Sequence, residues 1–361
     1  MFGRKSPFFY VGGRVEIRIF MRQLNNFTAL RWFAAGMVLY GHSFVFVGLP
    51  EPLFLGWATL GPLGVFVFFS ISGYLVSQSW ANDPNFIRFI KRRSIRIFPG
   101  LIVCILLSIF PFGYLISHLD GANYLKHSAT RGYLTNIFLY TTYYLPGVFE
   151  TNRVANAVNG SLWSLPAEFF MYLLLAILGV LKAKRSILTG VLLIFVFGTI
   201  FWALKAQEML VIYRTDARQV VICGGYFMMG VLLHRFNLAD FLSAANVIGI
   251  AIVWLCLSRW PTVFVASSYV VIPIFAIALG IGNTPGLSWL SRFDFSYGIY
   301  IYAFPIQQAL IYFFPEISFP IYLLSASIFT IIMAALSWYF IEKPALRFKP
   351  VQQTKILPSI S

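Results

Sequence analysis

Apolar runs of about 18 or more residues recur along the whole chain, and short polar segments separate them. A bilayer core about 30 Å thick is crossed by about 20 helical residues, so these runs predict membrane-spanning helices. One further apolar stretch, at 129–147, is a doubtful candidate, and it is not counted among the predicted spans. The pattern predicts roughly ten spans, at about 28–48, 58–80, 100–117, 162–181, 186–204, 218–233, 245–258, 261–282, 295–314 and 319–341.

The composition excludes a water-soluble protein. Of 361 residues, 59% are hydrophobic and only 11% are charged, and the mean hydropathy is +0.78. Linkers rich in Ser, Pro or Gly are absent from the sequence, as are repeats. We therefore expect an all-α polytopic membrane protein with one domain at 24–348, preceded by a cytoplasmic segment at 1–23 and followed by a cytoplasmic tail at 349–361.

The net charge of +15 could suggest a nucleic-acid partner, but the positions of the basic residues favour a membrane. With the N-terminus inside, nineteen of the 27 Lys and Arg residues fall on the inner set of alternate loops and seven on the outer set. Cytoplasmic loops of membrane proteins carry this excess. The distribution predicts that both termini are cytoplasmic, that the basic segments contact membrane lipids, and that nucleic acid is not a partner.

Three ionisable residues fall well inside predicted spans: Arg31, His42 and Glu168. Such groups are costly in a membrane and are functional candidates by default. Arg31 and His42 are eleven positions apart, so they share one helix face. His42 and Glu168 are each expected about 21 Å from the inner surface, where a carboxylate could orient the imidazole as a general base. The alternative is a buried polar contact that only sets helix packing.

The segment NFIRFIKRRSIRIFPG, at 85–100, alternates apolar and basic residues. It predicts an amphipathic helix in the cytoplasmic interface that ends at Pro99 and Gly100. Arg93 and Arg96 lie three positions apart on one face of that helix, where two guanidinium groups could bind phosphate. The plainer alternative is an anchor for anionic lipid. The longest hydrophilic connection, about 118–160, is expected on the outer side.

Several motifs in a fixed order resemble the acyltransferase 3 family, which comprises bacterial membrane proteins that acylate surface and secreted glycans. An arginine, ten residues and a histidine open the first helix, a paired-arginine motif follows the second, and a Trp-Ser-Leu-x-x-Glu block comes later. Two departures are present, since the family often has an acidic residue where Phe66 stands and a histidine where Ala303 stands. The matching segments are RWFAAGMVLYGH, GVFVFFSISGYL, RSIR, LWSLPAEFFMY, SYGIYIYAFPI and FIEKP.

The resemblance implies a function and a set of site residues. It implies an O-acetyltransferase of the bacterial inner membrane that uses acetyl-CoA or another acyl-CoA as donor, acts on a glycan or lipid-linked glycan, and needs no metal. By the matched motifs, His42, Arg31 and Glu168 belong to the catalytic site, and Arg93 and Arg96 to donor binding. Supporting candidates in the same motifs are Ser72, Trp163, Ser164 and Tyr300.

The sequence leaves the role of His42 open, and it leaves two alternatives to an acyltransferase. His42 could take the proton of the acceptor hydroxyl, or it could carry the acyl group itself. The buried His, Glu and Arg side chains also suit a secondary transporter or a flippase for lipid-linked sugar. The second alternative to an acyltransferase is a non-catalytic partner of a polysaccharide synthase.

Overall fold

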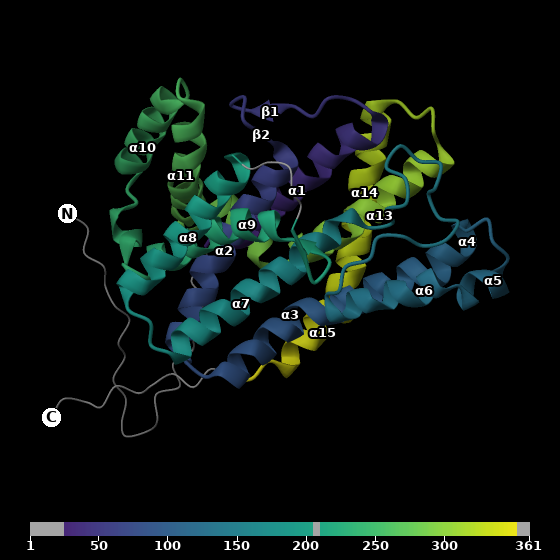
Figure 1. Cartoon of the computed structure of the whole chain (residues 1–361), viewed down its shortest axis with the longest axis horizontal. Helices are drawn as coiled ribbons and strands as arrows, with labels where there is room; N and C mark the ends of the chain where they lie inside the picture. The colour runs from purple at the N-terminus through teal and green to yellow at the C-terminus, as the bar shows by residue number, and fades with distance from the viewer. Residues whose placement is uncertain (1–24, 205–209, 352–361) are drawn as a thin grey trace.

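The computed structural model describes residues 25–204 and 210–351, and these residues form a bundle of long helices (Figure 1). Among the described residues, eight helical segments are long and apolar enough to cross a membrane, and each of them overlaps a predicted span. Helices α13, with 18 residues, and α10, with 14, correspond to the other two. The long helices are α1 (Phe27–Val47), α2 (Leu60–Asn82), α3 (Phe86–Leu107), α7 (Ser164–Val180), α8 (Arg185–Leu204), α9 (Ala217–Arg235), α10 (Ala244–Leu257), α11 (Pro261–Ile281), α13 (Ser296–Phe313) and α14 (Phe319–Ser337).

Short elements connect the long helices. Two small antiparallel hairpins, β1 (Leu53–Phe54) with β2 (Ala58–Thr59) and β3 (Val211–Ile212) with β4 (Thr215–Asp216), precede α2 and α9. The remaining elements are η1 (Ser108–Gly113), α4 (Tyr114–Ile116), α5 (Gly121–Lys126), α6 (Ser128–Tyr133), η2 (Leu134–Phe138), η3 (Gly160–Trp163), η4 (Leu238–Phe241), α12 (Pro285–Ser288), η5 (Trp289–Arg292), η6 (Trp338–Glu342), α15 (Lys343–Ala345) and η7 (Leu346–Phe348).

Helix α3 corrects one prediction. It does not end at Pro99 and Gly100 but runs through them, and with η1 and α4 it forms one helical segment over Phe86–Ile116. Pro99 removes a single backbone donor, and the apolar residues that follow it favour continued helix inside a membrane. A Cβ atom at Gly100 would lie 2.9 Å from the ring of Tyr297, so glycine lets α13 pack closely here. The basic segment is therefore the first half of a long helix rather than a separate interfacial one.

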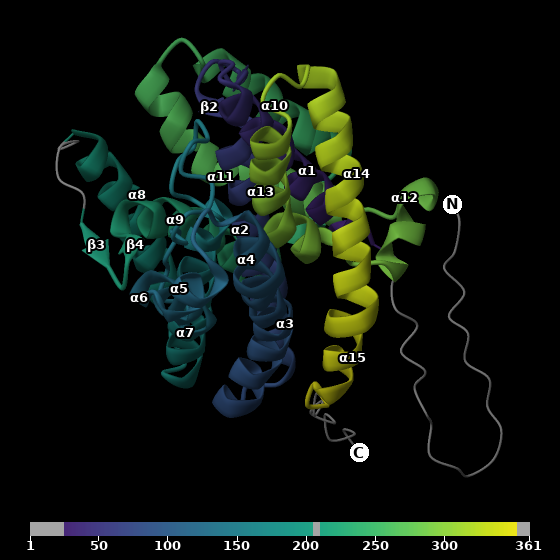
Figure 2. The same ribbon diagram turned by 90° about the vertical axis from the view of Figure 1, so that its right-hand side faces the viewer.

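The stretch 129–147 does not cross a membrane. It contains the short helices α6 and η2 and then irregular chain, in agreement with its exclusion from the predicted spans. This stretch is part of the longest connection, at about 118–160, whose later residues are hydrogen-bonded to α13. Asn159 donates to the carbonyl of Ile301 at 2.8 Å, and Asn152 donates to the side chain of Gln308 at 2.8 Å. Figure 2 shows the same bundle from the side of α14.

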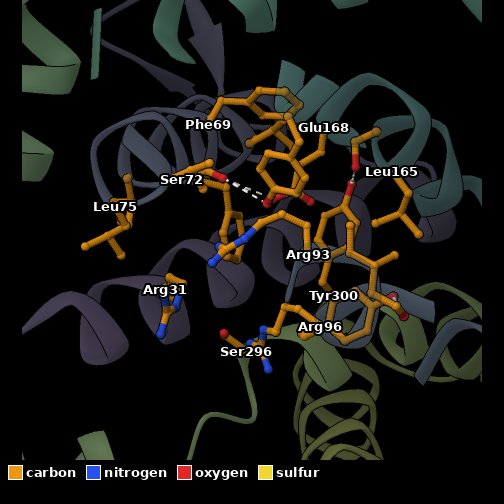
Figure 3. A pocket seen from close by; sticks show the side chains of 18 residues that line it. Arg31, Phe69, Ser72, Leu75, Arg93, Arg96, Leu165, Glu168, Ser296 and Tyr300 are labelled. Carbon is orange, nitrogen blue, oxygen red and sulfur yellow. Dashed lines mark hydrogen bonds between the residues drawn. The ribbon is translucent and has the colours of Figure 1, made fainter. Parts of the chain in front are cut away.

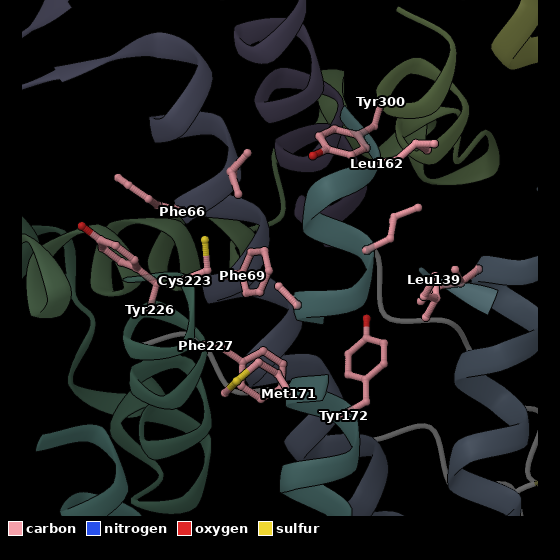
Figure 4. Packing of buried hydrophobic residues seen from close by; sticks show 14 of the residues in the cluster. Phe66, Phe69, Leu139, Leu162, Met171, Tyr172, Cys223, Tyr226, Phe227 and Tyr300 are labelled. Carbon is pink, nitrogen blue, oxygen red and sulfur yellow. The ribbon is translucent and has the colours of Figure 1, made fainter. Parts of the chain in front are cut away.

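The centre of the bundle is the crossing of α2 with α9. A Cβ atom at Gly73 would stand 2.0 Å from the carbonyl oxygen of Phe227, and one at Gly230 would stand 2.2 Å from that of Ser70. Small residues at such crossings let helix backbones touch, which is how helices associate in lipid. Around this contact Phe69, Met171 and Phe227 are buried together (Figure 4).

Candidate active site

Two of the cavities in the described part of the bundle are lined by the candidate residues, and we name them by their charged residues. The arginine cavity, of about 130 Å³, is lined by Arg31, Arg93 and Arg96, among others (Figure 3). The histidine cavity, of about 320 Å³, is lined by His42. We call the ends of the bundle that hold them the arginine end, where α1 and α3 begin, and the histidine end, where α1 finishes. The predicted polar face of the first helix thus serves both cavities.

Two of the three arginines share one carboxylate. Asp294, just before α13, accepts a hydrogen bond from Arg31 at 3.0 Å and from Arg96 at 2.9 Å. Arg96 also pairs with Glu342 at 3.2 Å, and Glu342 accepts a second bond from Ser337 at 2.9 Å. These bonds link the starts of α1, α3 and α13 to the end of α14.

Asp294 is ionised in this network. Burial alone would raise the pKa of its carboxyl, but the charges of Arg31 and Arg96 outweigh burial and lower the pKa to about 2. One carboxylate therefore balances part of the charge of two guanidinium groups, and it fixes where both of them point.

Arg93 is held differently, and it makes no ion pair within the described residues. Its guanidinium donates to Ser79 at 3.3 Å and lies 5.9 Å from the ring centre of Tyr172 and 5.8 Å from that of Phe89. Its Nε atom is buried and has no hydrogen-bond partner in the described part of the chain. Arg93 is thus a positive charge in the cavity wall that no described carboxylate neutralises through an ion pair.

Glu168 lies in the wall of the arginine cavity. Its carboxylate accepts a hydrogen bond from Ser72 at 3.2 Å and another from Tyr172, and the hydroxyls of Ser72 and Tyr172 are 3.0 Å apart. Ser72 therefore contacts a candidate catalytic residue directly, as Figure 3 shows.

His42 occupies the histidine cavity with aromatic and polar neighbours. Its ring packs edge to face on Phe304, with ring centres 5.6 Å apart, and its Nε2 atom would lie 3.9 Å from a Cβ atom built at Gly61. Its Nδ1 atom is buried and has no hydrogen-bond partner among the described residues. The rest of the wall includes Trp163, Tyr143, Asp216, Gln219 and Tyr300.

The expected meeting of Glu168 with His42 is not formed, because the two line different cavities. A contact between His42 and Glu168 required α1 and α7 to be neighbouring helices. Instead, α1 packs mainly on α2, α13 and α11, whereas α7 packs mainly on α3, α9 and α2. The expected common depth is not found either, since along α2 the His42 ring lies beside Gly61 whereas Glu168 bonds Ser72, eleven positions further on.

The sequence reasoning missed two acidic residues of the site, Asp294 and Glu342. Both lie at helix ends, outside the centres of the apolar runs, so a census of charges inside the runs did not include them. One signal was present, since Glu342 belongs to the FIEKP motif. Within the described residues, no group of three or more His, Cys, Asp or Glu side chains could hold a metal ion.

Comparison with known proteins bears directly on this arrangement. A family model described as an acyltransferase domain matches residues 24–342. An O-acetyl transferase of Shigella phage Sf6 is 31% identical over 90% of this chain and 96% of its own length. Nodulation protein 10 of Rhizobium leguminosarum bv. viciae is 28% identical over 90% of this chain and 94% of its own. No solved structure matches the chain significantly.

Proposed function

This chain belongs to the acyltransferase 3 family, and on that basis we propose that it moves an acetyl group from acetyl-CoA to a hydroxyl of a cell-surface or exported carbohydrate. One observation carries the proposal beyond family membership. A cavity rich in arginine and a cavity that contains a histidine share two lining residues, Val65 and Tyr300. An anionic carrier can thus bind on one side while its acyl group is delivered to a base on the other.

The arginine cavity suits the donor. Coenzyme A carries phosphate groups, and guanidinium groups bind phosphate through paired hydrogen bonds. Arg93 has no described ion-pair partner, and Arg31 and Arg96 are held in fixed positions by Asp294. The excess of basic residues on the loops of this end supports a cytoplasmic arginine end, cytoplasmic termini and a location in the bacterial inner membrane.

The histidine cavity suits a sugar hydroxyl. Trp163 and Tyr143 offer aromatic faces, and Asp216 and Gln219 offer hydrogen-bonding groups. In direct transfer, His42 takes the proton of the acceptor hydroxyl while the hydroxyl oxygen bonds to the acyl carbon. The thioester C–S bond then breaks, and the proton passes to the thiolate, so that free coenzyme A leaves. In the alternative, His42 bonds to the acyl carbon first, the thioester C–S bond breaks, and the thiolate takes the imidazole proton and leaves as free coenzyme A. The sugar hydroxyl oxygen then bonds to the acyl carbon, the C–N bond to His42 breaks, and the hydroxyl proton returns to the imidazole.

Replacing Arg93 with alanine is expected to raise the KM for acetyl-CoA by about 10- to 100-fold, because a hydrogen bond to a charged group contributes about 1.5–3 kcal/mol. Acetyl incorporation into glycan, measured in membranes over a range of acetyl-CoA concentrations, checks this. Lys91, which is exposed on the same helix, supplies the control variant Lys91→Ala. An unchanged KM for acetyl-CoA in Arg93→Ala, at matched protein level, would show that the donor does not bind in the arginine cavity.

Lys349 gives the donor site a pH dependence. Lys349 is half-buried and within electrostatic range of Arg31, Arg93, Arg96 and Asp294, and burial together with the charge of Arg96 lowers its pKa to about 8. Protonated Lys349 adds a cation for phosphate, so we expect the KM for acetyl-CoA to rise roughly tenfold between about pH 7 and 9.

The variant Lys349→Arg stays charged over this range and is expected to abolish the rise. Lost stability does not explain such a rise. The pKa of Lys349 is lower in the folded protein, so its contribution to folding becomes more favourable as the pH increases from about 8 towards 10. An identical pH profile in Lys349→Arg would show that Lys349 does not contact the donor.

A further inference from the structure

The two cavities meet at a wall formed by three helices. Val65 of α2 and Tyr300 of α13 line both cavities. The start of α7 lies at the same place, since Trp163 faces the histidine cavity and Ser164, the next residue, faces the arginine cavity. The shared lining residues therefore mark where the acyl group of a donor bound at the arginines would pass towards His42.

Tyr300 closes this wall. Its hydroxyl lies 2.6 Å from that of Ser164, so a hydrogen bond ties α13 to α7 across the junction (Figure 3). Its ring stands edge to face against Phe68 of α2, with ring centres 5.9 Å apart. The side chains are buried from solvent, since Tyr300 is 8% exposed and Val65 and Ser164 are each 5% exposed.

We propose that Tyr300, together with Val65, selects the acyl group by its length. The inference rests on the proposed function, because it concerns the path of the acyl group between donor and His42. An acetyl group presents one methyl beyond its carbonyl carbon, whereas each further methylene must displace the Tyr300 ring from its contacts with Ser164 and Phe68. Tyr300 is thus a specificity residue and takes no part in proton transfer.

The steric basis gives an expected size of effect. One methylene more or less in an apolar site changes the specificity constant by about 10- to 200-fold. The full-length protein in native membranes is therefore assayed with acetyl-, butyryl- and octanoyl-CoA, and kcat/KM is compared between donors. The wild type is expected to favour acetyl-CoA, and Tyr300→Ala is expected to lower the ratio of acetyl to octanoyl transfer by at least about tenfold.

Further variants keep the test decisive if Tyr300→Ala does not accumulate in the membrane. Val65→Ala shortens the other side chain that lines both cavities, on α2, and is expected to lower the same ratio. Tyr300→Phe keeps the ring but loses the bond to Ser164, so its ratio is expected to fall less. The matched control is Tyr226→Phe, which removes an equivalent hydroxyl pair with Ser268, 2.7 Å apart, from a tyrosine that lines neither cavity.

The outcomes separate the two proposals. An unchanged donor ratio in Tyr300→Ala and Val65→Ala, each folded and active, would overturn the role of Tyr300 and leave the acyltransferase function standing. If Tyr300→Ala does not accumulate in the membrane, an unchanged ratio of acetyl to octanoyl transfer in Val65→Ala and Tyr300→Phe would also overturn the role of Tyr300. A wild-type protein that transfers no acyl group from any coenzyme A thioester would instead overturn the proposed function and this inference with it.

Discussion

Replacing His42 with alanine is expected to lower acetyl transfer to glycan by about 10²–10⁴-fold, the usual contribution of a general acid or base. No other histidine lines either of the two cavities. Its Nδ1 atom has no partner among the described residues, so a contact that merely holds helices together is a poor account of why a histidine stands here. The measurement is incorporation of labelled acetyl groups into cell-surface glycan at matched membrane expression.

His234→Ala is the appropriate control. This histidine lies at the arginine end, with its Nδ1 atom 2.9 Å from the hydroxyl of Ser77, and it lines neither the arginine nor the histidine cavity. Its replacement is expected to leave transfer within a few-fold of wild type. Full acetylation in His42→Ala would instead favour a non-catalytic partner, and substrate transport without acyl transfer would favour the transporter or flippase.

A variant of the same experiment separates the two roles of His42. The protein is incubated with labelled acetyl-CoA in the absence of glycan. Label bound to the wild type but not to His42→Ala indicates that His42 carries the acyl group. Absence of label on a protein that still acetylates glycan indicates that His42 acts as the base in direct transfer.

Removing the carboxylate of Asp294 is expected to destabilise the protein more than any other single change at the site. Breaking a buried ion pair by deleting one partner costs about 3–5 kcal/mol, because the remaining charge is left unbalanced. Asp294 balances Arg31 and Arg96 together, so Asp294→Ala removes the carboxylate between two like charges and leaves Glu342 as the ion-pair partner of Arg96. The measurement is the thermal unfolding midpoint in detergent, with exposed Glu316→Ala as the control.

The pH dependence of stability gives a second measure of Asp294. Its pKa is lowered in the folded protein to about 2, so its stabilising contribution is fully present above about pH 4 and is lost as the pH falls through about 2. We expect the wild type to lose stability over that interval more steeply than Asp294→Asn. A midpoint for Asp294→Ala equal to that of Glu316→Ala would show that the network contributes little.

The sequence predicted the helices well because length and apolarity decide membrane crossing almost alone. It also predicted that Arg31 and His42 share a face, since helical geometry fixes that relation within one element. The sequence did not predict which helices pack against each other. Glu168 and His42 were expected at a common depth, but which helices are neighbours, and at which level, depends on packing around contacts such as Gly73, where no charge or period gives a signal. The role of Asp294 was hidden for the same reason, because its partners lie on α1 and α3.

The backbone contact between α2 and α9 has a mechanical consequence. Two helices that meet through glycines, with carbonyl oxygens where side chains would stand, have little room to slide or rotate against each other. Helix α2 supplies Val65 and Ser72 to the cavity walls, and α9 supplies Gln219. This pair therefore holds the α2 and α9 walls of the two cavities at a fixed separation, whereas α7 and α13 are joined at the junction by a single pair of hydroxyls.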